Sequence, residues 1–189
     1  IVFDAGEKTF RNQIDPNYKA NRSEPPEELK PQFALAVEAT EALGMTSYRM
    51  AGYEADDLMA TFAEEIESHD MELILGSPDK DLLQLVSPQV FTMDMKSYEI
   101  HDDRYVMRKF GVRPEQMVDF QALVGDPTDN IPGVAGIGAK GAAALLQHLH
   151  SLEAMYENLD PVAELPIRGA KSMLRKLEDG RSQALLSQR

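Results

Sequence analysis

The first hundred residues alternate between short apolar runs and longer segments whose apolar residues recur at helical spacing. The longer segments, 27–43 and 54–68, each place apolar side chains on one stripe, and Gly44 follows the first of them. The short runs predict three strands and a terminal hairpin, at 1–3, 47–50, 72–75, 90–93 and 97–100. Strands separated by helices favour an α/β fold with a twisted, mostly parallel sheet flanked by helices.

Beyond residue 100 the strand pattern stops and helical periodicity takes over. Five helices are expected there, at 103–110, 114–124, 140–150, 152–158 and 167–178. Glycine, proline and aspartate crowd the segment 125–138, which predicts structured turns. The chain therefore divides into an α/β region, 1–101, and a helical region, 102–189. The polar and basic segment 9–26 is expected to be a partly helical surface excursion.

The composition of the 189-residue chain excludes several classes of protein. It has no cysteine, which excludes disulfides and thiolate metal sites. No apolar run approaches the ~18 residues of a membrane span, and no basic-then-apolar leader opens the chain. We therefore expect a cytoplasmic protein with no membrane partner. Ile1 stands inside an apolar run, so we also expect that an N-terminal strand is missing from this sequence.

The net charge of −13 is unevenly distributed along the chain. Acidic residues dominate between positions 54 and 81, where Lys80 is the only base. Bases gather near the two ends, at Lys8, Arg11, Lys19 and Arg22, and at Arg168, Lys171, Arg175 and Lys176. Such separation suits a cation-binding site beside a phosphate-binding surface, although a solvated helix face is the more common origin of a charge run.

Eight acids form four clusters, three of them at one predicted sheet edge. They are Asp4; Glu54, Asp56 and Asp57; Asp79 and Asp81; and Asp126 and Asp129. Each cluster alone has an ordinary explanation as a helix cap, an acidic helix start or a turn. Together they would repel one another unless cations lie among them. Carboxylate oxygens suit Mg²⁺ or Mn²⁺, and two such ions about 3.5–4 Å apart are an arrangement that cleaves phosphodiesters.

A glycine-rich segment is the first candidate for phosphate binding. Gly133, Gly136 and Gly138 precede Lys140 and an apolar helix. Glycines let the backbone approach a phosphate, and a helix start offers free N–H groups. Contacts of this kind bind the DNA backbone without reading its sequence. A plain turn between two helices is the simpler interpretation.

The basic segment 18–22 is the second candidate. Tyr18 could stack on a base, and Lys19 and Arg22 could hold the scissile phosphate. A solvated basic loop explains the same residues equally well when they are taken alone.

Taken in order, these motifs resemble the flap endonuclease or 5′-3′ exonuclease family, and most of all the 5′-nuclease domain of bacterial DNA polymerase I. The resemblance covers nearly the whole chain. It rests on Phe3-Asp4, Tyr18-Lys19-x-x-Arg22, Gly52-x-Glu54-Ala55-Asp56-Asp57, Asp79-Lys80-Asp81, Gly125-Asp126-x-x-Asp129-Asn130-Ile131-Pro132-Gly133-Val134-x-Gly136-Ile137-Gly138, and Ile167-Arg168-Gly169-Ala170-Lys171.

The resemblance implies a PIN-like or 5′-nuclease-like sheet followed by a helix–three-turn–helix module that grips duplex DNA. It also implies roles for the acids: Asp4, Glu54, Asp56 and Asp79 in a first metal group, Asp57 beside it, and Asp81, Asp126 and Asp129 in a second. Lys19 and Arg22 would act on the scissile phosphate and Tyr18 would stack. The turn 133–140 would bind the duplex, and its carbonyls in this family commonly hold K⁺.

The implied function is two-metal hydrolysis of 5′-flap or branched DNA in replication and repair, as exonuclease and flap endonuclease, with a polymerase domain as a covalently linked partner. Two departures stand out. The family's first strand, which carries another metal-binding aspartate, is absent, and Gly141 stands where many relatives have a polar residue. A non-catalytic module that binds branched DNA, a related nuclease acting on RNA, and an acidic interaction domain are the alternatives.

Overall fold

The computed structural model describes residues 1–6 and 8–189. Its sheet has three strands, β1 (Leu73–Gly76), β2 (Val90–Met93) and β3 (Ile100–His101), in the order β1-β2-β3. β1 and β2 are parallel, whereas β2 and β3 are antiparallel. The sheet is therefore mixed rather than mostly parallel. The predicted terminal hairpin is confirmed, but its second strand starts three residues later because residues 94–99 form the turn.

Two predicted strands, 1–3 and 47–50, are wrong as regular strands. The segments meet in one parallel bridge between Val2 and Tyr48, outside the described sheet. Phe3 donates its N–H to the Tyr48 carbonyl at 2.8 Å, and Tyr48 donates to the Ile1 carbonyl at 2.8 Å. A strand pattern needs a ladder of partners to become a sheet, and these segments pair over one residue only.

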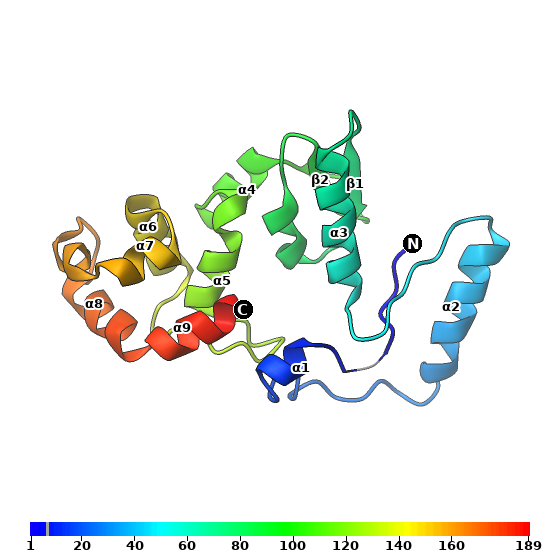
Figure 1. Cartoon of the computed structure of the whole chain (residues 1–189), viewed down its shortest axis with the longest axis horizontal. Helices are drawn as coiled ribbons and strands as arrows, with labels where there is room; N and C mark the ends of the chain where they lie inside the picture. The colour runs from blue at the N-terminus through cyan, green and yellow to red at the C-terminus, as the bar shows by residue number, and fades with distance from the viewer. Residues whose placement is uncertain (7) are drawn as a thin grey trace.

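Three α-helices and one 3₁₀ helix accompany the sheet: α1 (Arg11–Ile14), α2 (Lys30–Ala42), α3 (Ala55–Glu67) and η1 (Lys80–Leu85). The predicted helices at 27–43 and 54–68 are confirmed with shorter bounds. The apolar stripe expected on α2 is not buried, however, since the side chains of Leu29 and Phe33 are 39% and 55% exposed. Figure 1 shows α2 standing away from the other helices at one end of the molecule.

Helices make up the rest of the chain: α4 (Asp103–Phe110), η2 (Pro114–Gln116), α5 (Met117–Val124), α6 (Ala139–Leu149), α7 (Leu152–Glu157), η3 (Asp160–Glu164), α8 (Ala170–Asp179) and α9 (Arg181–Gln188). The five expected helices are present, although 114–124 divides into a 3₁₀ turn and an α-helix. No helix was expected at the positions of η3 and α9. None of the helices in the described ranges is long and apolar enough to cross a membrane.

The main hydrophobic core lies mostly in the helical region, and Leu83 and Val86 of the α/β region join it. Leu123 of α5, Leu145 and Leu146 of α6, and Leu177 of α8 are fully buried in it. A second, smaller cluster joins Ala63 of α3 to Leu75 and Val90 of the sheet. Because burial of apolar area is the main stabilising contribution to folding, the helical region is the more firmly held part.

Candidate metal and phosphate site

The start of α3 gathers acids from two segments. Glu54 is the N-cap of α3, and its backbone N–H donates to the Asp57 carboxylate at 2.8 Å. The next N–H, that of Ala55, donates to Asp4 at 2.7 Å. Free N–H groups at a helix start attract carboxylates, so this short stretch fixes Asp4 beside Glu54 although fifty residues separate them in the chain.

Asp57 is held further by Arg11 of α1. The guanidinium donates to both carboxylate oxygens of Asp57, at 2.9 and 2.7 Å. Burial alone would raise the pKa of Asp57, but the hydrogen bonds from Arg11 and from the Glu54 backbone lower it overall. Arg11 was not among the expected site residues. The sequence signal was only its membership of the basic group near the N-terminus.

The predicted phosphate-binding residues of segment 18–22 lie against predicted metal ligands. The Lys19 ammonium is 2.8 Å from a Glu54 carboxylate oxygen and 3.7 Å from Asp129. Tyr18 donates its hydroxyl proton to the same Glu54 oxygen at 3.0 Å, and Arg22 pairs with Asp129. Burial, followed by the charge of Glu54, raises the pKa of Tyr18, which therefore stays a neutral donor. These pairs bring the Glu54 and Asp129 clusters together.

The strand β1 leads to the second pair of acids. Asp79 caps η1 by accepting from the Asp81 N–H at 2.9 Å, so the ordinary explanation of this cluster as a helix cap holds for Asp79. Gln121 of α5 donates to the Asp81 side chain, a contact that the sequence did not suggest. Burial, followed by the neighbouring charge of Asp79, raises the pKa of Asp81. Asp81 thus faces α5 in a partly dry environment.

The turn after α5 contributes the last acids. Asp126 is buried and accepts from the Thr128 N–H at 2.8 Å, while Lys80 lies 2.9 Å from its other oxygen. Asp126 and Ile131 form a bridge that closes the turn around Asp129. Burial would raise the pKa of Asp126, but hydrogen bonds from Lys80 and Thr128 lower it overall.

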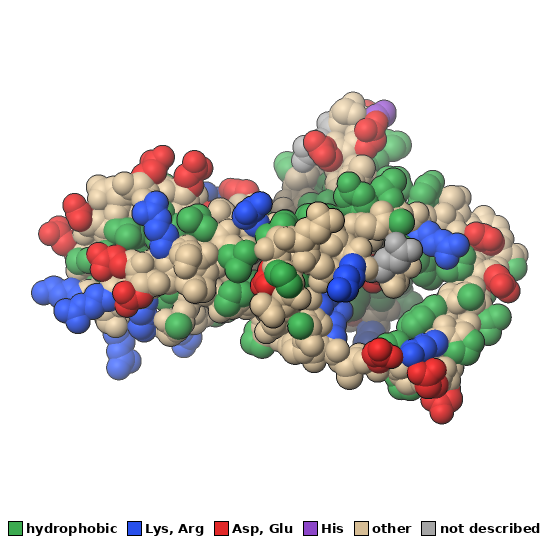
Figure 2. Space-filling model, turned by 60° about the horizontal axis from the view of Figure 1, so that its bottom comes forward, with side chains coloured by type: hydrophobic (Ala, Val, Ile, Leu, Met, Phe, Trp, Pro, Cys, Tyr) green, Lys and Arg blue, Asp and Glu red, His purple; other side chains and the backbone are tan. Residues whose placement is uncertain are grey.

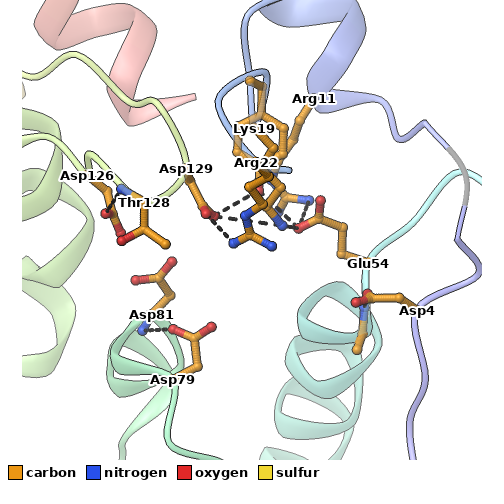
Figure 3. Close-up of polar contacts among 12 residues, drawn as sticks. Asp4, Arg11, Lys19, Arg22, Glu54, Asp79, Asp81, Asp126, Thr128 and Asp129 are labelled. Atoms are coloured by element: carbon orange, nitrogen blue, oxygen red, sulfur yellow. Dashed lines mark hydrogen bonds and ion pairs between the residues drawn. The ribbon is translucent and has the colours of Figure 1, made fainter. Parts of the chain in front are cut away.

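Figure 3 shows how these groups face one another. Asp79, Asp81 and Asp126 lie on one side and Glu54 and Asp4 on the other, with Lys19 and Arg22 between them. Among the described residues, no three acidic or histidine side chains are close enough to hold one metal ion. The acids of the predicted site therefore border a common space, with four cationic side chains paired to them.

Asp56 lies among other carboxylates, and their negative charges act on it. Burial, followed by the charges of Asp79, Glu54 and Asp4, raises the pKa of Asp56 to about 6. A carboxyl group that is difficult to ionise next to other carboxylates favours the arrival of a cation. The donors are carboxylate oxygens, which are the ligands that hard divalent ions prefer. The donor chemistry thus fits Mg²⁺ or Mn²⁺.

A cavity of about 340 Å³ adjoins the acids, and Glu54, Asp56, Asp81 and Asp129 are part of its lining. Apolar residues of η1, α5 and α9 also line it, among them Leu85, Val118 and Leu186. The low-dielectric wall strengthens every charge interaction at its rim.

The glycine-rich segment forms the turn before α6. Gly138 is the N-cap of α6, and the exposed Lys140 stands in its first turn. Gly133 crosses Gly125 so closely that a Cβ on Gly133 would lie 2.4 Å from the Gly125 nitrogen. Figure 2 shows Lys and Arg side chains interspersed with Asp and Glu at the end of the molecule that Figure 1 assigns to α6–α8. The turn therefore leads into an end of the molecule that carries charges of both signs.

A small mixed sheet, a helical region after it and a space bordered by carboxylates from four chain segments are features expected of a nuclease that uses divalent ions. Two family models match the chain end to end: "5′-3′ exonuclease, N-terminal resolvase-like domain" over residues 1–111 and "5′-3′ exonuclease, C-terminal SAM fold" over residues 112–189. The chain belongs to the 5′-3′ exonuclease family.

Curated relatives include DNA polymerase I of Rhizobium leguminosarum, 45% identical over 169 residues, which are 89% of this chain and 16% of that protein. A 5′-3′ exonuclease of Buchnera aphidicola is 36% identical over 187 residues, 99% of this chain and 65% of that protein. The chain thus spans less than two thirds of the length of either relative.

Solved structures agree with this assignment. The T5 D15 protein co-crystallised with metal ions matches with a TM-score of 0.82 at 25% identity, over 99% of this chain and 72% of that one. The catalytic core of Rad2 in complex with DNA shares the fold, with a TM-score of 0.60 at 17% identity over 98% of this chain and 62% of that one.

Proposed function

We propose that this chain is a structure-specific 5′ nuclease that hydrolyses a DNA phosphodiester near a junction of single and double strands, leaving a 5′-phosphate. One observation carries the proposal: acids from four separate chain segments border one space, and the two cations best suited to a phosphate lie among them. Family membership and the DNA-bound relatives support it. The presence of this region in DNA polymerase I proteins supports a role in replication and repair.

The proposed metal ligands come from both sides of this space, and Asp79 would complete the first group from across it. Asp4, Glu54, Asp56 and Asp79 would hold one ion with Asp57 beside them, and Asp81, Asp126 and Asp129 would hold the second. Bound divalent ions supply an activated water at neutral pH and stabilise the leaving oxygen. The capping contacts of Asp4 and Asp57 at α3 orient this carboxylate set before any ligand arrives.

Lys19 and Arg22 would bind the scissile phosphate. Both are paired with carboxylates in this structure, so they must exchange Glu54 and Asp129 for phosphate oxygens when substrate enters. Positive groups held beside the scissile phosphate stabilise charge that develops in the transition state. Tyr18, anchored by its hydroxyl on Glu54, is in position to stack on a base beside that phosphate.

The helical region would hold the duplex. The finer assignment we propose is a helix–three-turn–helix module, in which the turn before α6 presents backbone N–H groups of Gly136 and Gly138, together with Lys140, to backbone phosphates. The match of residues 112–189 to the C-terminal domain model of 5′-3′ exonucleases supports the assignment. Contact with phosphates alone would make binding independent of DNA sequence.

Cleavage of a 5′-flap duplex in Mg²⁺ and in EDTA tests the nuclease directly. Asp79→Asn keeps an oxygen acceptor for the cap of η1 but removes the charge, and Asp126→Asn does the same at the turn. Both variants should lose at least about 10²-fold in rate while retaining the wild-type circular dichroism spectrum. The exposed Asp70 supplies the matched control, since Asp70→Asn should cut normally. Equal cutting by all three variants would remove the mechanism, and an RNA flap in parallel decides between DNA and RNA.

One observation favours a second candidate, a non-catalytic module that binds branched DNA. Lys19, Arg22 and Lys80 each neutralise a predicted metal ligand, and no three of these acids converge among the described residues. Binding of a flap duplex in Mg²⁺ without cleavage would favour this candidate.

A further inference from the structure

A lysine of α8 lies on the glycine-rich turn. The Lys176 ammonium donates to the Gly136 carbonyl at 2.8 Å. Gly136 has φ +79°, and a Cβ built there would lie 3.0 Å from both Cε and Nζ of Lys176. The lysine stem therefore occupies the face that a side chain at position 136 would fill. A glycine in the left-handed region makes this contact possible.

The backbone of α8 around Lys176 is held firmly in place. Leu177, the next residue, is fully buried, and its carbonyl accepts from the Tyr156 hydroxyl at 3.1 Å. The Lys176 carbonyl accepts from the Gly180 N–H at 2.9 Å, and Gly180 packs against Val134 of the same turn. The ammonium also stands in the last turn of α8, where the helix dipole favours a positive charge. The contact with Gly136 is thus built on a rigid support.

This arrangement does not fit the K⁺ ion that the family resemblance implied for the turn. K⁺ would need carbonyl oxygens of the turn as ligands, and the Gly136 oxygen already accepts from a cation that belongs to the chain. An ammonium and K⁺ carry the same charge and are similar in size. An ammonium has three N–H donors, and one of them serves Gly136. Two remain for the oxygens of a phosphate.

We propose that Lys176 supplies the cation of this turn in place of K⁺, and that it bridges the Gly136 carbonyl and a backbone phosphate of duplex DNA. The inference rests on the proposed function, since it assumes that the turn binds a duplex. A tethered cation is present at full occupancy whatever the salt. Duplex binding by this chain is therefore insensitive to which monovalent cation the buffer contains.

Fluorescence anisotropy with a labelled blunt duplex tests this, without divalent ions, in KCl, NaCl and tetramethylammonium chloride at one ionic strength. Tetramethylammonium cannot enter a carbonyl site. The wild-type chain should bind equally in all three salts, within about twofold. Lys176→Met should bind at least about threefold more weakly in tetramethylammonium and sodium, and potassium should restore much of the loss.

Lys171→Met is the matched control, because Lys171 is an exposed lysine of the same helix. It removes the same charge and should lose affinity equally in all three salts. Lys176→Gln, with thermal unfolding of every variant, provides a second substitution if Lys176→Met folds poorly. A wild-type chain that requires K⁺ would overturn the inference, as would a Lys176→Met variant that matches Lys171→Met in every salt. A wild-type chain that binds no duplex in any salt would remove the proposed function, and the inference with it.

Discussion

Arg11 and Asp57 form a two-point ion pair, in which Nη1 donates to Oδ2 at 2.9 Å and Nη2 donates to Oδ1 at 2.7 Å. The pair joins α1 to the first turn of α3. Since Asp57 also accepts from the Glu54 backbone, Arg11 fixes the residue next to Asp56 and, through the cap, Glu54 itself. Arg11 is therefore a positioning residue for the acidic site.

Removing this guanidinium should destabilise the chain. Arg11→Met leaves a half-buried carboxylate without its main partner, and we expect a loss of about 1–3 kcal/mol in the free energy of unfolding at pH 7. Urea denaturation measures it. Arg49, which is exposed, gives the control, because Arg49→Met should change stability by less than about 0.5 kcal/mol. Equal stability of the two variants would show that the ion pair is not structural.

Lys80 and Asp126 provide a test of cation exchange. With Lys80→Met the buried Asp126 keeps its hydrogen bond from Thr128 but loses the ammonium at 2.9 Å. In EDTA we expect a loss of about 1–3 kcal/mol in unfolding free energy. Millimolar Mg²⁺ should recover more stability in Lys80→Met than in the wild type, because an ion takes over the role of the ammonium. Thermal melts with and without Mg²⁺ compare the two, and a deficit that Mg²⁺ leaves unchanged contradicts the exchange.

His101 gives a pH dependence away from the acidic site. Burial lowers the pKa of His101 below its ordinary 6.5; the nearby Lys109 adds to this, whereas Glu99 and Asp94 oppose it. A base whose folded pKa is depressed stabilises the fold above its unfolded pKa, and this contribution is lost as the pH falls through the folded pKa.

Denaturation of the wild type should therefore show decreasing stability below about pH 6.5. His101→Gln, which can keep a hydrogen bond to Thr92, should lose this component of the decrease. The exposed His148 supplies the control variant, His148→Gln, which should retain the wild-type profile. Identical profiles for all three proteins would contradict the assignment.

Alanine substitutions at two glycines with similar φ angles distinguish the cost of steric crowding from the cost of a left-handed backbone. Gly133→Ala places a Cβ 2.4 Å from the Gly125 nitrogen, at φ +62°. Gly169→Ala, at φ +81°, meets no atom within 4 Å. We expect about 1–2 kcal/mol of destabilisation at Gly169 from the left-handed backbone alone, and at least about 3 kcal/mol at Gly133. Similar losses at both positions, measured by urea denaturation, would show that the Gly125–Gly133 contact is not tight.

Local sequence patterns predicted much of the fold. The helix starting after Glu54, the strand at 73–76, the cap at Asp79 and the helices from residue 103 onward have signals within a few residues of themselves. The strand predictions for 1–3 and 47–50 were wrong because a strand depends on partners that its own sequence does not specify. The predicted burial of the apolar stripe of α2 was wrong for a similar reason, since amphipathic spacing does not reveal whether a second surface covers the helix.

The candidate site likewise contains residues that the sequence predicted and contacts that it did not. The acids were visible from their clustering, but their pairing with Lys19, Arg22 and Lys80 was not. Arg11, Gln121 and Lys176 were missed as contacts because each acts on a residue at least 40 positions away. Contacts of this kind arise from packing of separate elements, which a single sequence does not encode in any local pattern.

Titration of the chain with Mn²⁺, followed by electron paramagnetic resonance of the free ion, tests most directly whether these acids form a metal centre. The account predicts saturable binding of two ions per wild-type chain, and weaker binding in Asp79→Asn and in Asp126→Asn, with Asp70→Asn like the wild type. No saturable binding to the wild-type chain, or identical binding by all four proteins, would contradict it.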